Sequence, residues 1–158
     1  ANSDGWKPEN AQKNMEQILT ANNNAVDAVL SENDGMAGGV VAALSAQGLV
    51  IPVGGQDGDL AAINRVALGT QTVSVWKNAK DLGKVAAEAA NALADGTAID
   101  AVAGVKKFAD GKNKVEMNAI LLEPTPITKA NVNVAIDAGH ITKDQACAGV
   151  AAGAVPGC

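Results

Sequence analysis

The strongest constraint on the fold is a unit that occurs twice in a row: a short apolar run, a polar stretch and a segment with helical spacing. The apolar runs have the length of buried strands, and a third run that alternates in polarity follows them. These predicted strands cover residues 25–30, 49–55 and 71–77, with helices expected over 36–47 and 60–68. Because right-handed crossovers lay such strands side by side, the sequence predicts an α/β fold, a parallel sheet with flanking helices.

Polar side chains stand at the end of each predicted strand. Asn33 and Asp34 follow the first strand, Gln56 and Asp57 end the second, and Lys77 ends the third. The carboxyl ends of parallel strands meet at one edge of a sheet, where α/β proteins bind small polar ligands. We therefore expect an amide, a carboxylate and an ammonium to share one polar cleft. The local alternative is that the amide and carboxylates cap helices or form Asx turns, and that the lysine is merely solvated.

The pattern changes after residue 77. A long helix is predicted over residues 81–94, and two antiparallel strands are predicted over 101–108 and 114–122 around a polar turn. Pro124 and Pro126 then impose an extended path that suits a strand passing from one lobe to another. One side of the helix is expected to hold the apolar residues Leu82, Val85, Ala86, Ala89 and Leu93.

Helices are expected near both ends of the chain. One opens near Pro8, with Ala11, Met15, Ile18 and Leu19 as its buried stripe. Near the other end, Thr128 or Asn131 is predicted to cap one helix and Thr142 another.

Composition excludes several classes of function. The formal net charge is −5 and the lysines are spread thinly, so no basic face exists for a phosphate backbone, and we expect no nucleic-acid partner. No run approaches the length of a transmembrane helix. The paired glycines at residues 38–39 and 54–55 lack the lysine and spacing of a phosphate loop.

Two cysteines, Cys147 and Cys158, lie close together in a tail rich in glycine, alanine and proline. This spacing lets a small loop close, so a disulfide and an oxidising compartment such as the periplasm are expected, the alternative being two unrelated thiols. One histidine and two cysteines make no ligand set, so no metal and no cofactor are expected. His140 follows a glycine at a predicted helix end and is interpreted as a surface or capping residue.

Several short motifs, in this order, resemble the second half of the type I periplasmic binding proteins that serve ABC importers of pentoses and hexoses. The resemblance covers residues 6 to about 141, and the tail departs from it. Its motifs are Trp6-Lys7-Pro8-Glu9-Asn10-Ala11, Ala21-Asn22-Asn23-Asn24, Asn33-Asp34, the run 44–49, Gly55-Gln56-Asp57, Gly69-Thr70-Gln71-Thr72, Trp76-Lys77 and the run 122–132.

The resemblance implies two α/β lobes, joined by three crossing segments, that close over one sugar. Residues 1–77 and the returning segment 123–158 would belong to one lobe, and residues 78–122 to part of the other. The family's first half has no counterpart here, and the chain runs straight into a helix start. We therefore expect a fragment of a longer protein, completed by its missing N-terminal half, a partner chain or a second copy.

The resemblance also implies a role for each candidate residue. Asn33 would bond sugar hydroxyls, Asp57 would accept from two neighbouring hydroxyls, and Lys77 would donate to a hydroxyl or ring oxygen near the hinge. Trp6 would stack on the C–H face of the sugar, unless it only anchors the first helix. Asp34 and Gln56 would brace the loop. Trp76 stands where the family often has tyrosine, and it is interpreted as a packing residue.

The implied function is a non-enzymatic periplasmic receptor that closes on a monosaccharide, a pentose such as xylose, and presents it to a membrane permease. A second reading is the effector-binding domain of a sugar-responsive transcription regulator of the LacI type, which an upstream DNA-binding segment would decide. A third is a glycosidase with Asp34 and Asp57 as its two carboxylates, although no histidine, serine or metal set accompanies them. A purely structural fragment is the fourth.

Overall fold

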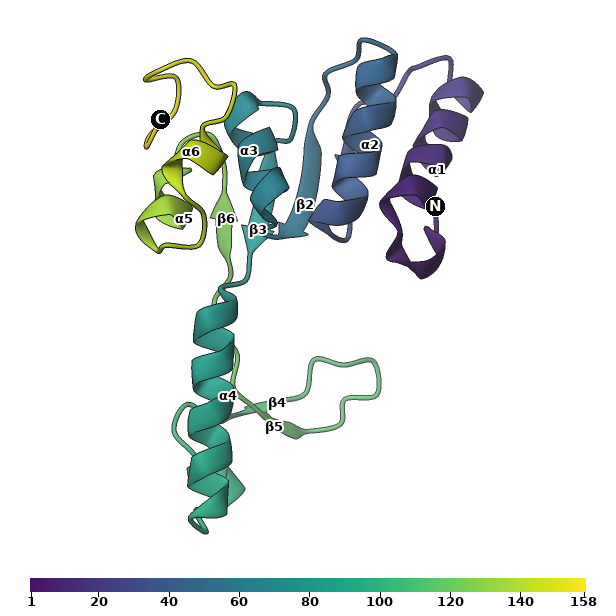
Figure 1. Ribbon diagram of the computed structural model, residues 1–158. Helices are drawn as coiled ribbons and strands as arrows, with labels where there is room; N and C mark the ends of the chain where they lie inside the picture. The colour runs from purple at the N-terminus through teal and green to yellow at the C-terminus, as the bar shows by residue number, and fades with distance from the viewer. The chain divides into compact units, whose positions relative to one another are not determined.

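The computed structural model describes residues 1–158, and these residues form two compact units. Unit 1 comprises Ala1–Lys77 and Pro124–Cys158, and unit 2 comprises Asn78–Glu123. The chain thus leaves unit 1 after Lys77 and returns to it at Pro124, as the teal and green segments of Figure 1 show. None of the helices combines the length and the apolar character needed to cross a membrane.

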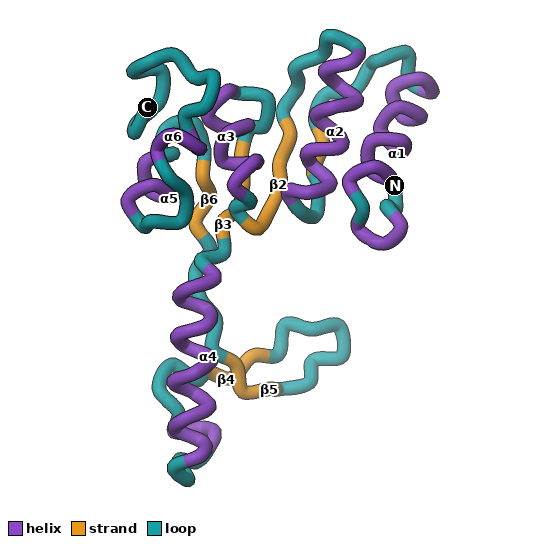
Figure 2. The backbone as a smooth tube through the Cα atoms, viewed as in Figure 1, coloured by secondary structure: helices purple, strands orange, loops and turns teal.

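Unit 1 is built on a four-stranded sheet with the order β1-β2-β3-β6 (Figure 2). The first three strands are parallel, and β6 is antiparallel to β3. The α/β class predicted from the repeated units is confirmed, whereas the antiparallel edge strand is a feature that those units did not predict. The strands are β1 (Val29–Leu30), β2 (Val53–Asp57), β3 (Val73–Trp76) and β6 (Thr125–Ile127).

The helices of unit 1 begin and end where local signals place them. Asn33 caps α2 by accepting a hydrogen bond from the Met36 backbone N–H at 2.9 Å. Gly69 ends α3 in the left-handed conformation with φ 88°, which glycine adopts without strain. The helices are η1 (Asp4–Trp6), α1 (Pro8–Ala21), α2 (Asp34–Ala46), α3 (Leu60–Leu68), α5 (Asn133–Asp137) and α6 (Lys143–Ala146).

Two apolar clusters hold unit 1 together. The first lies between α1, α2 and β2, and a side chain at Gly39 would collide with the Pro8 carbonyl oxygen, so the two helices pack closely. The second joins α3, β3 and β6 to the C-terminal helices. The main members are Met15, Leu19, Val40, Leu44 and Val53 in the first cluster, and Ile63, Val66, Trp76, Ile127, Val132 and Val155 in the second.

The C-terminal tail is fastened to unit 1 at several points. Cys147 and Cys158, which are 11 positions apart in the sequence, form a disulfide that closes a small loop. Asn64 of α3 donates to the carbonyl oxygens of Ala146 and Ala148 at 3.0 and 2.9 Å. Val155, inside the disulfide loop, is buried. The tail therefore packs on α3 as part of the second cluster.

Unit 2 contains one long helix and a hairpin. The antiparallel pairing of β4 and β5 was predicted from the sequence and is confirmed, although both strands are shorter than expected. The helix predicted over residues 81–94 is present as α4, but its apolar side is largely open: no residue of α4 is buried, and Leu82 and Leu93 are 47% and 46% exposed. The elements are α4 (Ala79–Ala94), η2 (Ile99–Ala101), β4 (Lys106–Phe108) and β5 (Met117–Ala119).

Two further local predictions have different outcomes. Thr142 caps α6 and forms a complete capping box with Gln145, as predicted. The cap predicted for α5 is wrong, because that helix begins after Val132 without a side-chain cap. Asn131 instead accepts a hydrogen bond from the Thr128 backbone N–H at 2.7 Å and closes a turn before the helix.

Candidate functional site

The carboxyl ends of β2 and β3 bring two of the predicted site residues together. Asp57 ends β2, and in the parallel register it lies opposite Trp76, the residue before Lys77. Lys77 Nζ is 2.8 Å from Asp57 Oδ1. The two side chains keep 45% and 38% of their surface exposed, so a ligand can reach both. The carboxylate and the ammonium thus form one polar group at the edge of the sheet.

The backbone at Asp57 has a conformation that side chains disfavour. Its φ is 103°, and Gly58 after it has φ 77°. A non-glycine residue with such a φ is uncommon, and surrounding structure must hold it in place. Gly58 also has no room for a side chain, because a Cβ there would collide with the Trp76 indole. The carboxylate therefore projects from a constrained turn between β2 and α3.

Asp34 supplies part of that constraint. Its side chain is completely buried and accepts hydrogen bonds from the backbone N–H groups of Gly58 and Asp59 at 2.9 and 3.0 Å. It also accepts from Gln71 Nε2 at 2.8 Å and from Ser74 Oγ at 2.5 Å. One carboxylate therefore connects the end of β1 to the loop after β2 and to β3. With four donors around it and no exposed surface, Asp34 is placed to brace the loop, not to touch a ligand.

A second ring of contacts holds Asp34 and its partners. Arg65 of α3 donates from Nε to Gln71 Oε1 at 3.0 Å and from Nη2 to the Asp34 backbone oxygen at 2.8 Å. Burial lowers the pKa of the Arg65 guanidinium, and the nearby charges of Asp34 and Asp59 act in the opposite direction. A side chain at Gly55 would collide with Asp34 Oδ1 and Gln71 Nε2. The side chains of Asp34 and Gln71 can therefore meet over residue 55 only because this residue is a glycine.

Asn33 and Gln56 lie beside this network. Asn33 is half-buried, and its cap of α2 uses the amide oxygen and not the Nδ2 group. Gln56 is half-buried within β2, and its side chain makes no hydrogen bond in the structure. Asp34 braces the loop together with Ser74, which accepts from the Gly58 N–H, and Gln71, which donates to Asp34; the sequence analysis did not assign a role to Ser74 or Gln71. Strand alternation puts Ser74 on the same face as Trp76, but it does not indicate which group Ser74 bonds.

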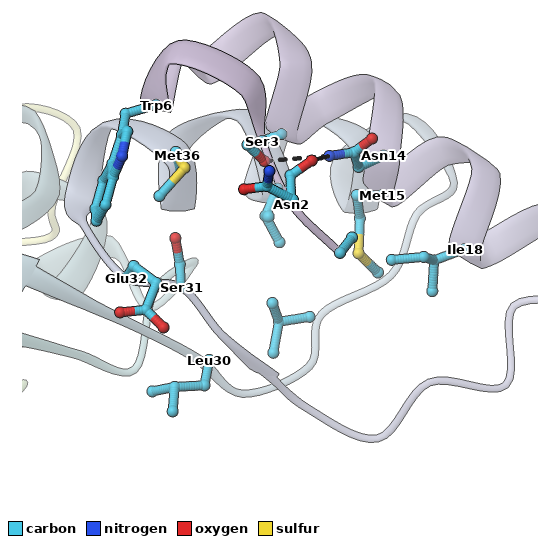
Figure 3. A pocket seen from close by; sticks show the side chains of 14 residues that line it. Asn2, Ser3, Trp6, Asn14, Met15, Ile18, Leu30, Ser31, Glu32 and Met36 are labelled. Atoms are coloured by element: carbon cyan, nitrogen blue, oxygen red, sulfur yellow. Dashed lines mark hydrogen bonds between the residues drawn. The ribbon is translucent and has the colours of Figure 1, made fainter. Parts of the chain in front are cut away.

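Trp6 lies at a separate hollow of unit 1. Its side chain is 59% exposed, and its φ is 57°. The indole, Ser31, Glu32 and Met36 line a pocket of about 200 Å³. Figure 3 shows Met36 beside the indole and Ser31 and Glu32 below them. Asn33, Asp57 and Lys77 do not line this pocket. The structure therefore brings Asp57 and Lys77 together but does not bring Trp6 to them.

His140 is the residue that sequence reasoning placed wrongly. It is half-buried, and its Nε2 lies 2.6 Å from the Gly58 carbonyl oxygen. Its ring packs on the buried Trp76 with 4.9 Å between centroids and 37° between planes. The interpretation as a surface or capping residue is therefore wrong, whereas the interpretation of Trp76 as a packing residue is confirmed. A lone histidine after a glycine gives no sequence signal of such a contact.

The exposed groups at this edge suit a neutral ligand with many hydroxyls. A carboxylate only accepts hydrogen bonds and an ammonium only donates them, whereas a hydroxyl does both. Hydrogen bonds to charged groups are also stronger than those between neutral groups. Because the two charges compensate each other, the pair offers strong polar contacts without requiring a charged ligand.

Comparison with known proteins identifies the family of this chain and several relatives. The sequence profile of the family described as "Periplasmic binding protein domain" matches residues 1–98 of this chain. The chain is 56% identical over 95 residues to the D-xylose-binding periplasmic protein of Escherichia coli. It is 44% identical over 145 residues to the protein of that name from Haemophilus influenzae. These alignments cover 59% and 90% of this chain but 29% and 42% of the relatives, so the chain spans less than half of their length.

Solved structures give the same fold. A solute-binding protein of an ABC transporter from Clostridium phytofermentans, with bound β-D-glucose, matches with a TM-score of 0.75 at 31% identity, over 91% of this chain and 45% of that one. A carbohydrate transporter solute-binding protein from Chloroflexus aurantiacus, in complex with D-glucose, matches with a TM-score of 0.76 at 26% identity, over 89% and 42%. The resemblance read from the sequence motifs is confirmed at the level of the family. The chain therefore belongs to the periplasmic binding protein domain family.

Proposed function

We propose that this chain is part of a periplasmic receptor that binds a monosaccharide and delivers it to an ABC importer. The observation that carries the proposal is the Asp57–Lys77 pair, an exposed carboxylate and ammonium held at the carboxyl edge of a parallel sheet. Family membership and the 56% identity to a D-xylose-binding periplasmic protein supply the ligand class. We propose D-xylose or a close pentose as the preferred sugar.

Each proposed contact follows from the chemistry of a hydroxyl. Asp57 accepts from two neighbouring sugar hydroxyls, and Lys77 donates to a third oxygen of the sugar. The Nδ2 group of Asn33 adds a donor, since its oxygen already caps α2. A sugar that leaves one of these groups unpaired loses about 1–3 kcal/mol of binding free energy, which is the basis for discrimination. Trp6 would stack on the C–H face of the ring only if its segment meets the bound sugar.

The receptor is proposed to be longer than this chain. The chain spans less than half of the two D-xylose-binding relatives, and Leu82 and Leu93 of α4 in unit 2 are 47% and 46% exposed. An apolar groove of unit 2 is lined by Val85, Ala89, Val102, Ile120 and Leu122, among other residues. Exposed apolar surface of this kind is typical of a lobe whose remaining part is contributed elsewhere. We infer that the N-terminal half of the same protein completes unit 2 and adds the opposite wall of the sugar site.

A glycosidase is not favoured by the same geometry. Retaining and inverting glycosidases use two carboxyl groups that both reach the scissile bond. Asp34 is completely buried and occupied by four hydrogen-bond donors, so only Asp57 of the two is accessible. A receptor needs no second accessible carboxylate.

The test is a calorimetric titration of the full-length protein with D-xylose, D-ribose, L-arabinose and D-glucose. Saturable binding that is tightest for D-xylose supports the proposal as stated. Tight binding of D-glucose alone would retain a sugar receptor but reject the pentose assignment. Absence of binding to every sugar, or release of a hydrolysed product from xylosides, would overturn the proposed function.

A further inference from the structure

The backbone N–H and the backbone carbonyl of Gly58 are both hydrogen-bonded. Its N–H donates to Asp34 Oδ2 at 2.9 Å and to Ser74 Oγ at 3.1 Å. Its carbonyl oxygen lies 2.6 Å from His140 Nε2, although 82 residues separate the two in sequence. A carbonyl oxygen only accepts, so Nε2 carries a proton and donates this bond. Both backbone polar groups of Gly58, the residue after Asp57, are therefore hydrogen-bonded, and these bonds fix the turn that presents Asp57.

The same imidazole also contacts the strand that presents Lys77. The ring packs on Trp76 at a centroid distance of 4.9 Å. Trp76 is buried, precedes Lys77 and lies opposite Asp57 in the β2–β3 register. His140 therefore contacts the residue after Asp57 and the residue before Lys77, but neither member of the pair.

The segment that carries His140 is itself well anchored. The His140 backbone N–H donates to the Ala135 oxygen of α5 at 3.0 Å, and Ala135 is completely buried. The next residue, Ile141, belongs to the second apolar cluster. A ring attached to a fixed backbone can hold a neighbouring turn, whereas a ring on an exposed loop cannot.

We infer that His140 is a positioning residue for the sugar site: through Gly58 and Trp76 it sets the geometry of the Asp57–Lys77 pair. The inference rests on the proposed function, because the pair is taken as the ligand contact. Without the imidazole N–H, the Gly58 carbonyl loses its donor, and only the bonds of the Gly58 and Asp59 N–H groups still hold Asp57 at its unusual φ of 103°. The carboxylate would then meet the sugar hydroxyls in a range of orientations.

The test compares His140→Phe, which keeps a ring on Trp76 but removes the N–H, with Asn133→Ala, a control on α5 outside the contact. In the full-length protein, His140→Phe is expected to weaken D-xylose binding about tenfold, the effect of one lost hydrogen bond. The control should bind as the wild type does. In an Asp57→Asn background the loss from His140→Phe should fall below about twofold, because both changes act on one contact. The same fold loss in both backgrounds would overturn the inference and leave His140 as a packing residue.

A second readout does not depend on sugar. In ¹⁵N NMR spectra of the free protein, His140→Phe should move the amide resonances of residues 57–59, and Asn133→Ala should leave them in place. If the wild type binds no sugar at all, the proposed function fails, and these resonances alone decide whether His140 positions the turn. Unchanged resonances would contradict the inference. If the phenylalanine variant does not fold, His140→Gln serves in both measurements, and its amide donor predicts a smaller loss than that of Asp57→Asn.

Discussion

Asp57 and Lys77, at the ends of two neighbouring parallel strands, form an ion pair with 2.8 Å between Oδ1 and Nζ. An exposed pair of this kind adds only about 0–1 kcal/mol to folding stability. Yet the carboxylate stands on a backbone with φ 103°, which costs about 1–3 kcal/mol when surroundings enforce it. The ion pair therefore returns less stability than the backbone conformation costs, and we infer that Asp57 is held there for binding and not for stability.

The first prediction concerns this pair. Asp57→Asn removes the charged acceptor while keeping the size of the side chain, so D-xylose binding should weaken about tenfold to a hundredfold, the range expected for hydrogen bonds to a charged group. Asp27→Asn, an exposed carboxylate of the same unit, is the matched control and should bind normally. Calorimetric titration of both variants measures the difference. Equal affinities for the two variants would remove Asp57 from the site.

The second prediction concerns two glycines with opposite surroundings. Gly55→Ala drives a methyl group into Asp34 Oδ1 and Gln71 Nε2, so it should lower the free energy of unfolding by about 1–3 kcal/mol. Gly83→Ala meets no atom within 4 Å on α4 and should stabilise that helix by about 0.5–1 kcal/mol. Urea denaturation followed by circular dichroism compares them. A neutral Gly55→Ala would show that the buried network does not need its close approach.

The third prediction concerns the disulfide. A disulfide between residues 11 positions apart is expected to stabilise the folded chain by roughly 2.5–3 kcal/mol through the entropy of the unfolded state. The double variant Cys147→Ser, Cys158→Ser should lose that amount in urea denaturation. Treatment of the wild type with a reductant should give the same curve as the variant. A variant as stable as the oxidised wild type would mean that Val155 and the bonds from Asn64 hold the tail without the disulfide.

The fourth prediction concerns pH. Burial raises the pKa of the Asp59 carboxyl above its ordinary value of 3.8, with the charges of Asp34 and Asp57 acting in the same direction and those of Arg65 and His140 opposing them. The folded state therefore holds this proton more tightly than the unfolded chain does. Its contribution to stability is present at low pH and is lost as pH rises through the raised pKa.

Asp59→Asn stays neutral at every pH and keeps a residue suited to a helix N-cap. Its melting temperature should exceed that of the wild type near neutral pH, by a small margin because the side chain is exposed. The margin should vanish below about pH 4, where the wild-type carboxyl is protonated as well. Melting curves at several pH values measure it. A margin that grows toward low pH would reverse the assigned direction of the pKa shift.

Local features of the fold were predictable because their causes are local. The helix over residues 60–68 was predicted at its observed bounds, since apolar spacing and the left-handed Gly69 define it. The apolar side of α4 was predictable but its exposure was not, because periodicity reports which side is apolar and not whether anything covers it. The first strand was predicted over six residues and spans two, as β1 pairs with β2 alone at the edge of the sheet.

The candidate site, like the fold, has a part that could be predicted from the sequence and a part that could not. Asp57 and Lys77 could be predicted to meet, because parallel strands present their carboxyl ends at one edge. The network around Asp34 could not, since Gln71 and Ser74 lie 37 and 40 residues away along the chain. The contact of His140 with Gly58 spans 82 residues and leaves no trace in spacing or composition. Contacts set by tertiary packing become visible only in the structure.

The most direct test of the central claim is an NMR titration of the full-length protein with D-xylose that follows the side-chain signals of Asp57 and Lys77. The account predicts that the carboxyl carbon of Asp57 and the terminal carbon and nitrogen of Lys77 shift and saturate together with the sugar. Lys84, an exposed lysine of α4, is the internal control and should not shift. If sugar binding saturates while the Asp57 and Lys77 signals stay in place, the pair is not the sugar contact and the proposed site is wrong.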